Sequence, residues 1–91
     1  MLGQLCATRG VANRIAEDDA FRQFVQASLR RYIAGDWGEM AEEDKELNDV
    51  AVSEGGRIFG ACRDAKHSDW RIWIITEADR SVTTVLFPDE Y

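Results

Sequence analysis

WIITEADRSVTTVLF, residues 73–87, predicts two β-strands joined by a short loop. Isoleucine, valine, threonine and aromatic residues, which favour extended backbone, fill both ends of the stretch. The five residues EADRS separate them, and Asp and Ser side chains stabilise tight turns by hydrogen bonding to nearby backbone. We therefore expect an antiparallel hairpin here, which assigns the C-terminal third of the chain to β-structure.

A third strand precedes this hairpin. RIFGACR, residues 57–63, has the same composition, and the loop DAKHSD connects it to WRIWIIT, residues 70–76. Because short connections favour antiparallel neighbours, residues 57–87 predict a three-stranded antiparallel β-meander. Side chains alternate between the two faces of a strand, and WRIWIIT places apolar residues on both faces.

The first half of the chain has helical periodicity instead. In DDAFRQFVQASLRRYIAGD apolar residues recur three and four positions apart, so residues 19–34 predict an amphipathic helix with an aspartate N-cap. Gly35 supplies its end. Thr8 is the expected N-cap of a shorter helix over residues 10–17.

A third helix is expected over residues 41–53, where acidic residues crowd the first turn. Leu47, Val50 and Ala51 form its narrow apolar stripe, and Gly55 follows it. The change from helical to strand periodicity predicts an α+β fold, with two or three N-terminal helices packed on the C-terminal meander. With 91 residues, the chain is expected to form a single small domain, 1–91.

The charge of the chain is concentrated in one segment. The formal net charge is −6, and residues 36–54 alone carry eight acidic residues against Lys45, a net charge of −7. Because such a segment repels phosphates, we expect no direct binding of nucleic acid and favour a basic protein as partner. No stretch is apolar over a membrane-spanning length and no secretory leader opens the sequence, so we expect a cytoplasmic protein without membrane contact.

Several residues are candidates for contact with a partner. Trp37 lies in a turn, where a large aromatic side chain either fills the core or stands exposed as a contact anchor, and core filling is the commoner outcome. The acidic side of the third helix faces either solvent or a basic protein surface. The candidate residues are Asp36, Trp37, Glu42, Glu43, Glu46, Asp49, Glu77, Asp79 and Arg80.

The loop EADRS has two interpretations. It is either the solvated tip of a hairpin, or a polar binding site in which Glu77, Asp79 and Arg80 gather beside Thr83 and Thr84. The hairpin tip is the simpler interpretation, because its composition is that of a turn.

We expect no enzyme, because the sequence lacks a nucleophile with a nearby base and lacks metal-ligand spacing. We therefore assign no catalytic residue, no metal ligand and no cofactor. Cys6 and Cys62 are isolated and predict neither a disulfide framework nor a zinc site. The alternative is a small metal-dependent or hydrolytic enzyme that uses Asp36, Glu77 and Asp79 as convergent carboxylates.

A second alternative is a homodimeric structural or regulatory protein. Four apolar residues of the predicted sheet could share a face that three short helices leave bare. These residues are Trp73, Ile75, Val85 and Phe87.

Three motifs carry a resemblance to a known family. LGQLCATRGV near the start, GDWGEMAEEDKELN in the middle and WIITEADRSVTTVLFPDEY at the end resemble a family of small bacterial proteins of plasmids, integrative elements and prophages, labelled "plasmid-related" or hypothetical. The resemblance implies a mobile-element context and transfers no catalytic residue. Together with the acidic helix, it predicts a non-enzymatic protein-binding module, in its sharpest form an inhibitor of a bacterial defence complex, anti-CRISPR or anti-restriction.

Overall fold

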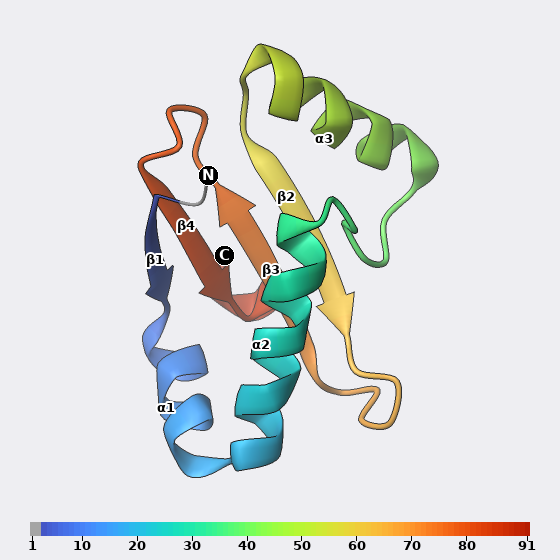
Figure 1. Cartoon of the computed structure of the whole chain (residues 1–91). Coiled ribbons are helices and arrows are strands. Elements are labelled where there is room, and N and C mark those ends of the chain that lie inside the picture. The colour runs from blue at the N-terminus through green and yellow to red at the C-terminus, as the bar shows by residue number, and fades with distance from the viewer. Residues whose placement is uncertain (1–2) are drawn as a thin grey trace.

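The computed structural model describes residues 3–91 and has the expected α+β architecture (Figure 1). Two helices, α1 and α2, cover one face of a sheet, and a third helix, α3, lies beside the edge strand β2. No helix in residues 3–91 is both long and apolar enough to cross a membrane. The elements are β1 (Gln4–Ala7), α1 (Arg9–Glu17), α2 (Asp19–Ile33), α3 (Glu42–Glu54), β2 (Ile58–Arg63), β3 (Arg71–Thr76), β4 (Val82–Leu86) and the 3-10 helix η1 (Pro88–Glu90).

The sheet has four strands in the order β1-β4-β3-β2. The expected antiparallel meander is confirmed in β2, β3 and β4. The expected strand count is wrong, because β1 pairs in parallel with β4 and makes the sheet mixed. The sequence of β1, QLCA, is too short to show an alternating pattern. It pairs with a strand more than seventy residues further along the chain, since Gln4 lies opposite Val82.

The three helices begin and end within one or two residues of the predicted positions. The Thr8 hydroxyl accepts a hydrogen bond from the Val11 N–H at the start of α1. The Asp18 carboxylate accepts hydrogen bonds from two N–H groups in the first turn of α2. These side chains satisfy donors that a helix cannot pair internally. Gly35 follows α2 with a φ of +88°, a conformation that only glycine adopts without strain.

The main core lies between the sheet and the helices α1 and α2. Its apolar members include Val11, Phe21, Val25, Tyr32, Ile72, Ile74 and Val85. A chain of buried hydroxyls crosses it, because the Tyr32 hydroxyl lies 2.8 Å from that of Thr76, which lies 2.8 Å from that of Thr83. Burial raises the pKa of Tyr32, so its hydroxyl stays protonated and can donate within this chain.

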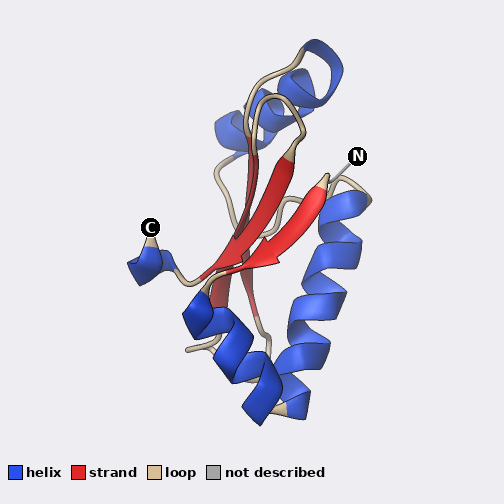
Figure 2. Cartoon of the chain, turned by 90° about the vertical axis from the view of Figure 1, so that its left-hand side faces the viewer, coloured by secondary structure: helices blue, strands red, loops and turns tan. Residues whose placement is uncertain are grey.

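The opposite face of the sheet is covered only in part. The C-terminal segment and η1 lie over part of this side, opposite the main bodies of α1 and α2 (Figure 2). The ring of Trp73 packs edge-on against Phe59 and Tyr91, with centroid distances of 5.0 and 5.6 Å.

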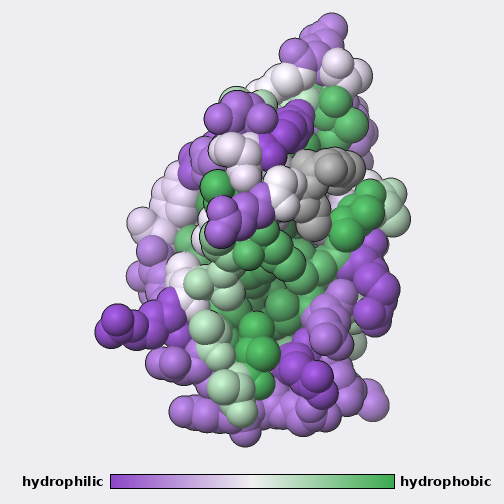
Figure 3. Space-filling model, turned by 60° about the vertical axis from the view of Figure 1, so that its left-hand side comes forward, coloured by the Kyte–Doolittle hydropathy of each residue, from purple (hydrophilic) through white to green (hydrophobic). Residues whose placement is uncertain are grey.

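The four residues expected to share a bare sheet face do not do so. Trp73 and Ile75 point to the face that carries Tyr91. Val85 is buried in the core on the helix side, and the ring of Phe87 packs there against Phe21 at 5.7 Å. The expectation that these four residues form one apolar surface for a homodimer is therefore wrong. Exposed apolar residues gather elsewhere, on the side of the molecule formed by β1 and the two helices (Figure 3).

The loop between α2 and α3 lies against the outer edge of β2. The Ala61 N–H donates to the Trp37 carbonyl at 3.0 Å, and the Glu39 N–H donates to the Ala61 carbonyl at 2.7 Å. Between them, Gly38 has a φ of +83°, and a Cβ at this position would lie 1.9 Å from the Ala61 carbonyl oxygen. Only glycine permits this approach of the two backbones.

The two glycines of this loop allow a matched test. We expect Gly35→Ala to destabilise the protein by about 1–2 kcal/mol, because its φ is positive but open space surrounds it. Gly38→Ala is expected to cost roughly 3 kcal/mol or more, because the new methyl group must also push the loop off β2. Urea unfolding measures both values, and equal losses would contradict the role assigned to the close approach.

The C-terminus is joined to the start of α1 through Glu90. Its carboxylate accepts hydrogen bonds from the Thr8 hydroxyl at 2.6 Å, the Phe87 N–H at 2.9 Å and the Gly10 N–H at 3.2 Å. The Thr8 hydroxyl, then the Phe87 and Gly10 N–H groups, hold the pKa of Glu90 below its ordinary value. The ionised form of Glu90 therefore stabilises the fold.

The pH dependence of stability tests this contact. A carboxyl whose pKa is lowered in the folded state stabilises above its unfolded pKa of about 4.3, and this contribution disappears as pH falls through the lower folded value. We expect Glu90→Gln to flatten the pH dependence of the unfolding free energy between about pH 5 and 3. Asp89→Asn, an exposed neighbour without these contacts, is the control, and a slope unchanged by Glu90→Gln would contradict the assignment.

Candidate protein-binding surface

Helix α3 is attached to the sheet by a side-chain amide. The Asn48 Nδ2 donates to the Phe59 carbonyl at 2.6 Å, and the Phe59 N–H donates to the Asn48 Oδ1 at 3.1 Å. The amide therefore pairs with the edge of β2 as another strand would. Buried Asn48 and Ala51 face the sheet. Of the predicted stripe of Leu47, Val50 and Ala51, only Ala51 is therefore buried, and the expectation is wrong for Leu47 and Val50.

Arg80 supplies a second attachment. Its guanidinium donates at 2.6 Å to the carbonyl of Gly56 and at 2.6 Å to the carbonyl of Ala51, near the C-terminal end of α3. The Arg80 backbone has a φ of +64°, in the left-handed region that residues other than glycine rarely adopt. Arg80 is thus a structural clamp between the hairpin tip and α3, and its guanidinium is occupied by backbone.

The carboxylates of the hairpin tip have local partners. The hydroxyl of Ser81, then its N–H, lower the pKa of Asp79, whose Oδ1 accepts both bonds at 2.6 and 3.0 Å. Glu77 lies 3.6 Å from Arg57 in an ion pair. Thr83 is fully buried, and Thr84 lies on the other face of the sheet, so the two hydroxyls do not join one polar site. EADRS is a turn, and the alternative of a gathered polar site is wrong.

Trp37 fills the core. It is 4% exposed and packs edge-on against Tyr32 at a centroid distance of 5.3 Å. Its indole N–H donates to the exposed Asp49 carboxylate at 3.0 Å. The expectation of core filling is confirmed, and Trp37 as an exposed contact anchor is wrong.

Asp36 stabilises the turn before Trp37. Its carboxylate accepts from the Arg31 Nε at 2.8 Å and from the Gly38 N–H at 3.1 Å. The Arg31 guanidinium, followed by the Gly38 N–H, lowers the pKa of Asp36. Both side chains are about half exposed, so this pair orients the loop more than it stabilises the fold.

The side of α3 that is not packed on the sheet is both acidic and apolar. Leu47 is 66% exposed and Val50 is 50% exposed. Glu43 and Glu46, each four positions before one of them, lie on the same side of the helix and form no ion pair or hydrogen bond within residues 3–91. Glu43, Glu46, Leu47 and Val50 are called the outward face of α3. Glu42 adjoins this face and lies 3.7 Å from Lys45.

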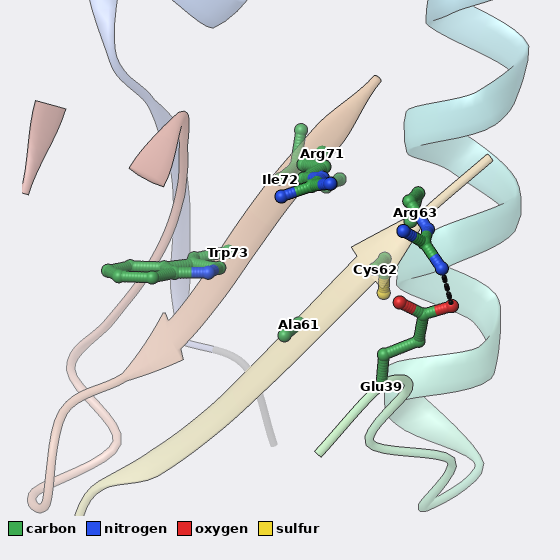
Figure 4. A pocket seen from close by; sticks show the side chains of 7 residues that line it. All are labelled: Glu39, Ala61, Cys62, Arg63, Arg71, Ile72 and Trp73. Carbon is green, nitrogen blue, oxygen red and sulfur yellow. Dashed lines mark hydrogen bonds and ion pairs between the residues drawn. The ribbon is translucent and has the colours of Figure 1, made fainter. Parts of the chain in front are cut away.

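A groove of about 590 Å³ separates α3 from the partly covered face of the sheet. Leu47 lines it from the helix, while Phe59 and Trp73 line it from the sheet. A smaller depression of about 210 Å³ continues from it along β2 and β3 (Figure 4). The groove can therefore accept apolar side chains next to the outward face of α3.

The smaller depression carries two arginines on paired positions of neighbouring strands. Arg63 lies opposite Arg71, and Glu39 reaches Arg63 from the loop after α2 with an ion pair of 3.0 Å (Figure 4). Like charges directly opposite each other destabilise a sheet, and Glu39 offsets one of them. Arg71 has no ion-pair partner among residues 3–91 and can contact a carboxylate of a bound protein.

The alternative enzyme site requires three carboxylates to converge. Asp36 pairs with Arg31 and Glu77 with Arg57, while Asp79 bonds within its own turn. Within residues 3–91, no group of three His, Cys, Asp or Glu side chains is arranged to hold a metal ion. The structure therefore gives these three residues separate roles.

Sequence reasoning missed Asn48 and Arg63. Asn48 has a readable signal, because an amide on the inner side of an otherwise periodic helix requires a hydrogen-bonding partner. Arg63 gives no such signal, because its significance depends on the register that places it opposite Arg71.

No protein-family model, no curated protein and no solved structure matches the chain.

Removal of the Arg80 clamp is expected to loosen α3. Arg80→Ala leaves the carbonyls of Ala51 and Gly56 without their charged donor, so we expect a loss of about 1.5–3 kcal/mol of unfolding free energy. Hydrogen exchange of the last turn of α3 should accelerate more than exchange in β3. Arg71→Ala, which removes an exposed arginine, is the control and should stay within about 0.5 kcal/mol of wild type. Equal effects of the two substitutions would contradict the clamp.

Proposed function

We propose that this protein is a non-enzymatic, cytoplasmic protein-binding module whose contact surface is the outward face of α3 with the adjoining groove. The observation that carries the proposal is the exposure of Leu47 and Val50 on a helix whose position is already fixed by polar contacts. A soluble helix normally buries such residues, and here they lie beside unpaired carboxylates. The surface fits a partner with an apolar pocket bordered by lysine or arginine.

The carboxylates supply attraction at long range. Glu43 and Glu46 belong to a segment with a net charge of −7, and neither is neutralised by an ion pair within the described residues. An acidic surface of this kind accelerates the encounter with a basic protein and selects against acidic ones.

The apolar residues supply affinity once the surfaces meet. Burial of a leucine or valine side chain contributes about 1.5–3 kcal/mol relative to full exposure. Leu47 and Val50 are half or more exposed, so a partner can still gain much of this contribution. The groove lined by Phe59 and Trp73 extends the apolar contact beyond the helix.

The sharpest form of the proposal concerns the identity of the partner. Nucleic-acid-binding proteins present basic surfaces, and an acidic domain that covers such a surface competes with nucleic acid. Together with the resemblance to proteins of mobile elements, this supports an inhibitor of a bacterial defence complex of the anti-CRISPR or anti-restriction kind.

Charge reversal on α3 tests the proposal. The bait is the full chain, compared with a Glu42→Lys, Glu43→Lys, Glu46→Lys variant in affinity capture from a host lysate, followed by association kinetics with the captured protein. We expect the variant to associate at least about tenfold more slowly at low salt and to lose most of the salt dependence. Leu47→Ala with Val50→Ala should instead accelerate dissociation.

A matched control shows whether the effect depends on where the charges are reversed or only on the change in net charge. Glu17→Lys, Asp69→Lys and Asp89→Lys change the net charge equally at exposed positions outside α3. This control is expected to retain most of the association rate. Capture of an acidic partner, or equal weakening by the two triple variants, would contradict the proposal.

A further inference from the structure

One of the two edge strands of the sheet is covered by other parts of the chain. The outer edge of β2 is covered. Ala61 exchanges backbone hydrogen bonds with the 37–39 loop, and Phe59 exchanges two with the Asn48 amide. An exposed strand edge is a template for pairing with another chain, and proteins usually cover or charge it. The fold therefore protects β2 from strand addition.

The edge at β1 has no such cover. Within residues 3–91, β1 pairs only with β4, and Figure 2 shows it at the front with no helix or loop across it. The N–H groups of Gln4 and Thr8 bond to the carbonyls of Ser81 and Val85. Because bonding alternates along a parallel ladder, the N–H and C=O groups of the intervening residues Leu5 and Ala7 point away from the sheet. QLCA contains no charge and no proline to discourage pairing.

An apolar groove lies beside this open edge. It has a volume of about 320 Å³, and its lining includes Leu5, Ile15, Val25 and Leu29. Figure 3 shows this apolar surface in the middle of the side that carries β1, surrounded by hydrophilic residues. Leu5, which belongs to both the edge and the groove, is 51% exposed.

We propose that β1 is the interface of a two-fold homodimer, in which β1 of one copy pairs antiparallel with β1 of the second copy. The two four-stranded sheets then form one sheet of eight strands. The outward N–H and C=O groups of Leu5 bond to those of Ala7 in the partner, and the reciprocal bonds follow from symmetry.

The register of this pairing follows from the direction of the backbone groups. Within β1, residues 5 and 7 present the outward hydrogen-bonding groups, and all of them are paired when Leu5 lies opposite Ala7 of the second copy. A large and a small side chain then face each other on the helix side of the sheet, next to the apolar groove. On the other side of the sheet, Cys6 lies opposite Cys6 of the second copy, in a pair that exchanges no hydrogen bonds.

The charge distribution selects a second copy as the occupant. Two chains with a net charge of −6 repel each other unless their acidic parts stay apart. Helix α3 lies at the β2 edge, opposite β1 in the sheet order, and the segment 36–54 accounts for more than the whole net charge. Pairing through β1 therefore keeps the two acidic segments 36–54 at the far ends of the joined sheet.

Sedimentation tests the dimer and the strand that forms it. We expect the full chain to shift from monomer to dimer as its concentration rises. Ala7→Pro removes an outward N–H without touching the bonds to β4, and Leu5→Lys places a charge on the edge. Both variants should weaken dimerisation at least tenfold, whereas Val52→Lys, which adds the same charge at an exposed apolar residue outside both surfaces, should leave it unchanged.

Cross-linking tests the register. In an antiparallel pair without hydrogen bonds the Cα atoms lie about 4.5 Å apart, a separation that a disulfide can span. Diamide, which takes up the two electrons and two protons released by two thiols, should join the copies through Cys6. Cys6→Ser should abolish this product, and Cys62→Ser should not, because Cys62 is buried.

A monomer at all concentrations, or a dimer that resists both edge variants, overturns the proposal, and so does the absence of the Cys6 product. Circular dichroism verifies that each variant is folded, and Leu5→Lys retains the test if Ala7→Pro unfolds. Capture of a strand from another protein by a monomeric chain also overturns it. None of these outcomes bears on the outward face of α3, so this inference and the proposed function fail separately.

Discussion

The close approach of Gly38 to the backbone of β2 determines where the third helix lies. A Cβ at this position would overlap the Ala61 carbonyl oxygen, so the two backbones can bond only through glycine. That contact places Trp37 in the core beside Tyr32 and sends the chain past the edge of the sheet. Helix α3 then lies alongside β2, and its Asn48 side chain bonds to the Phe59 backbone.

Because polar contacts fix α3, the exposed apolar side chains of Leu47 and Val50 are not required to hold the helix in place. The amide of Asn48 and the guanidinium of Arg80 bond to backbone in fixed directions, and Asp49 bonds to the indole of Trp37. Such bonds specify geometry with little apolar burial. A helix held in this way can present Leu47 and Val50 to solvent without losing its position, which is the property that a contact surface needs.

Periodicity and capping identify the helices and the meander, because these depend on neighbouring residues and on turns of a few residues. β1 has no such signal, since its four residues pair only after the rest of the sheet exists. The role of Arg80 is equally hidden, because a residue in a turn-like loop reaches carbonyls 24 and 29 positions away. The inward stripe of α3 was misjudged because periodicity scores Leu47 as core, whereas the amide of Asn48 decides which side faces β2.

The molecule separates its charge from its open edge. α3 and β1 lie at opposite edges of one sheet, so a dimer through β1 would carry an outward face of α3 at each end. Two linked faces bind a partner with two basic sites more tightly than one face does, because the second contact becomes intramolecular. This gain requires that the spacing of the partner's sites match the span of eight strands. A partner with repeated basic subunits at that spacing would therefore favour the dimer, and an isolated basic protein would not distinguish it from the monomer.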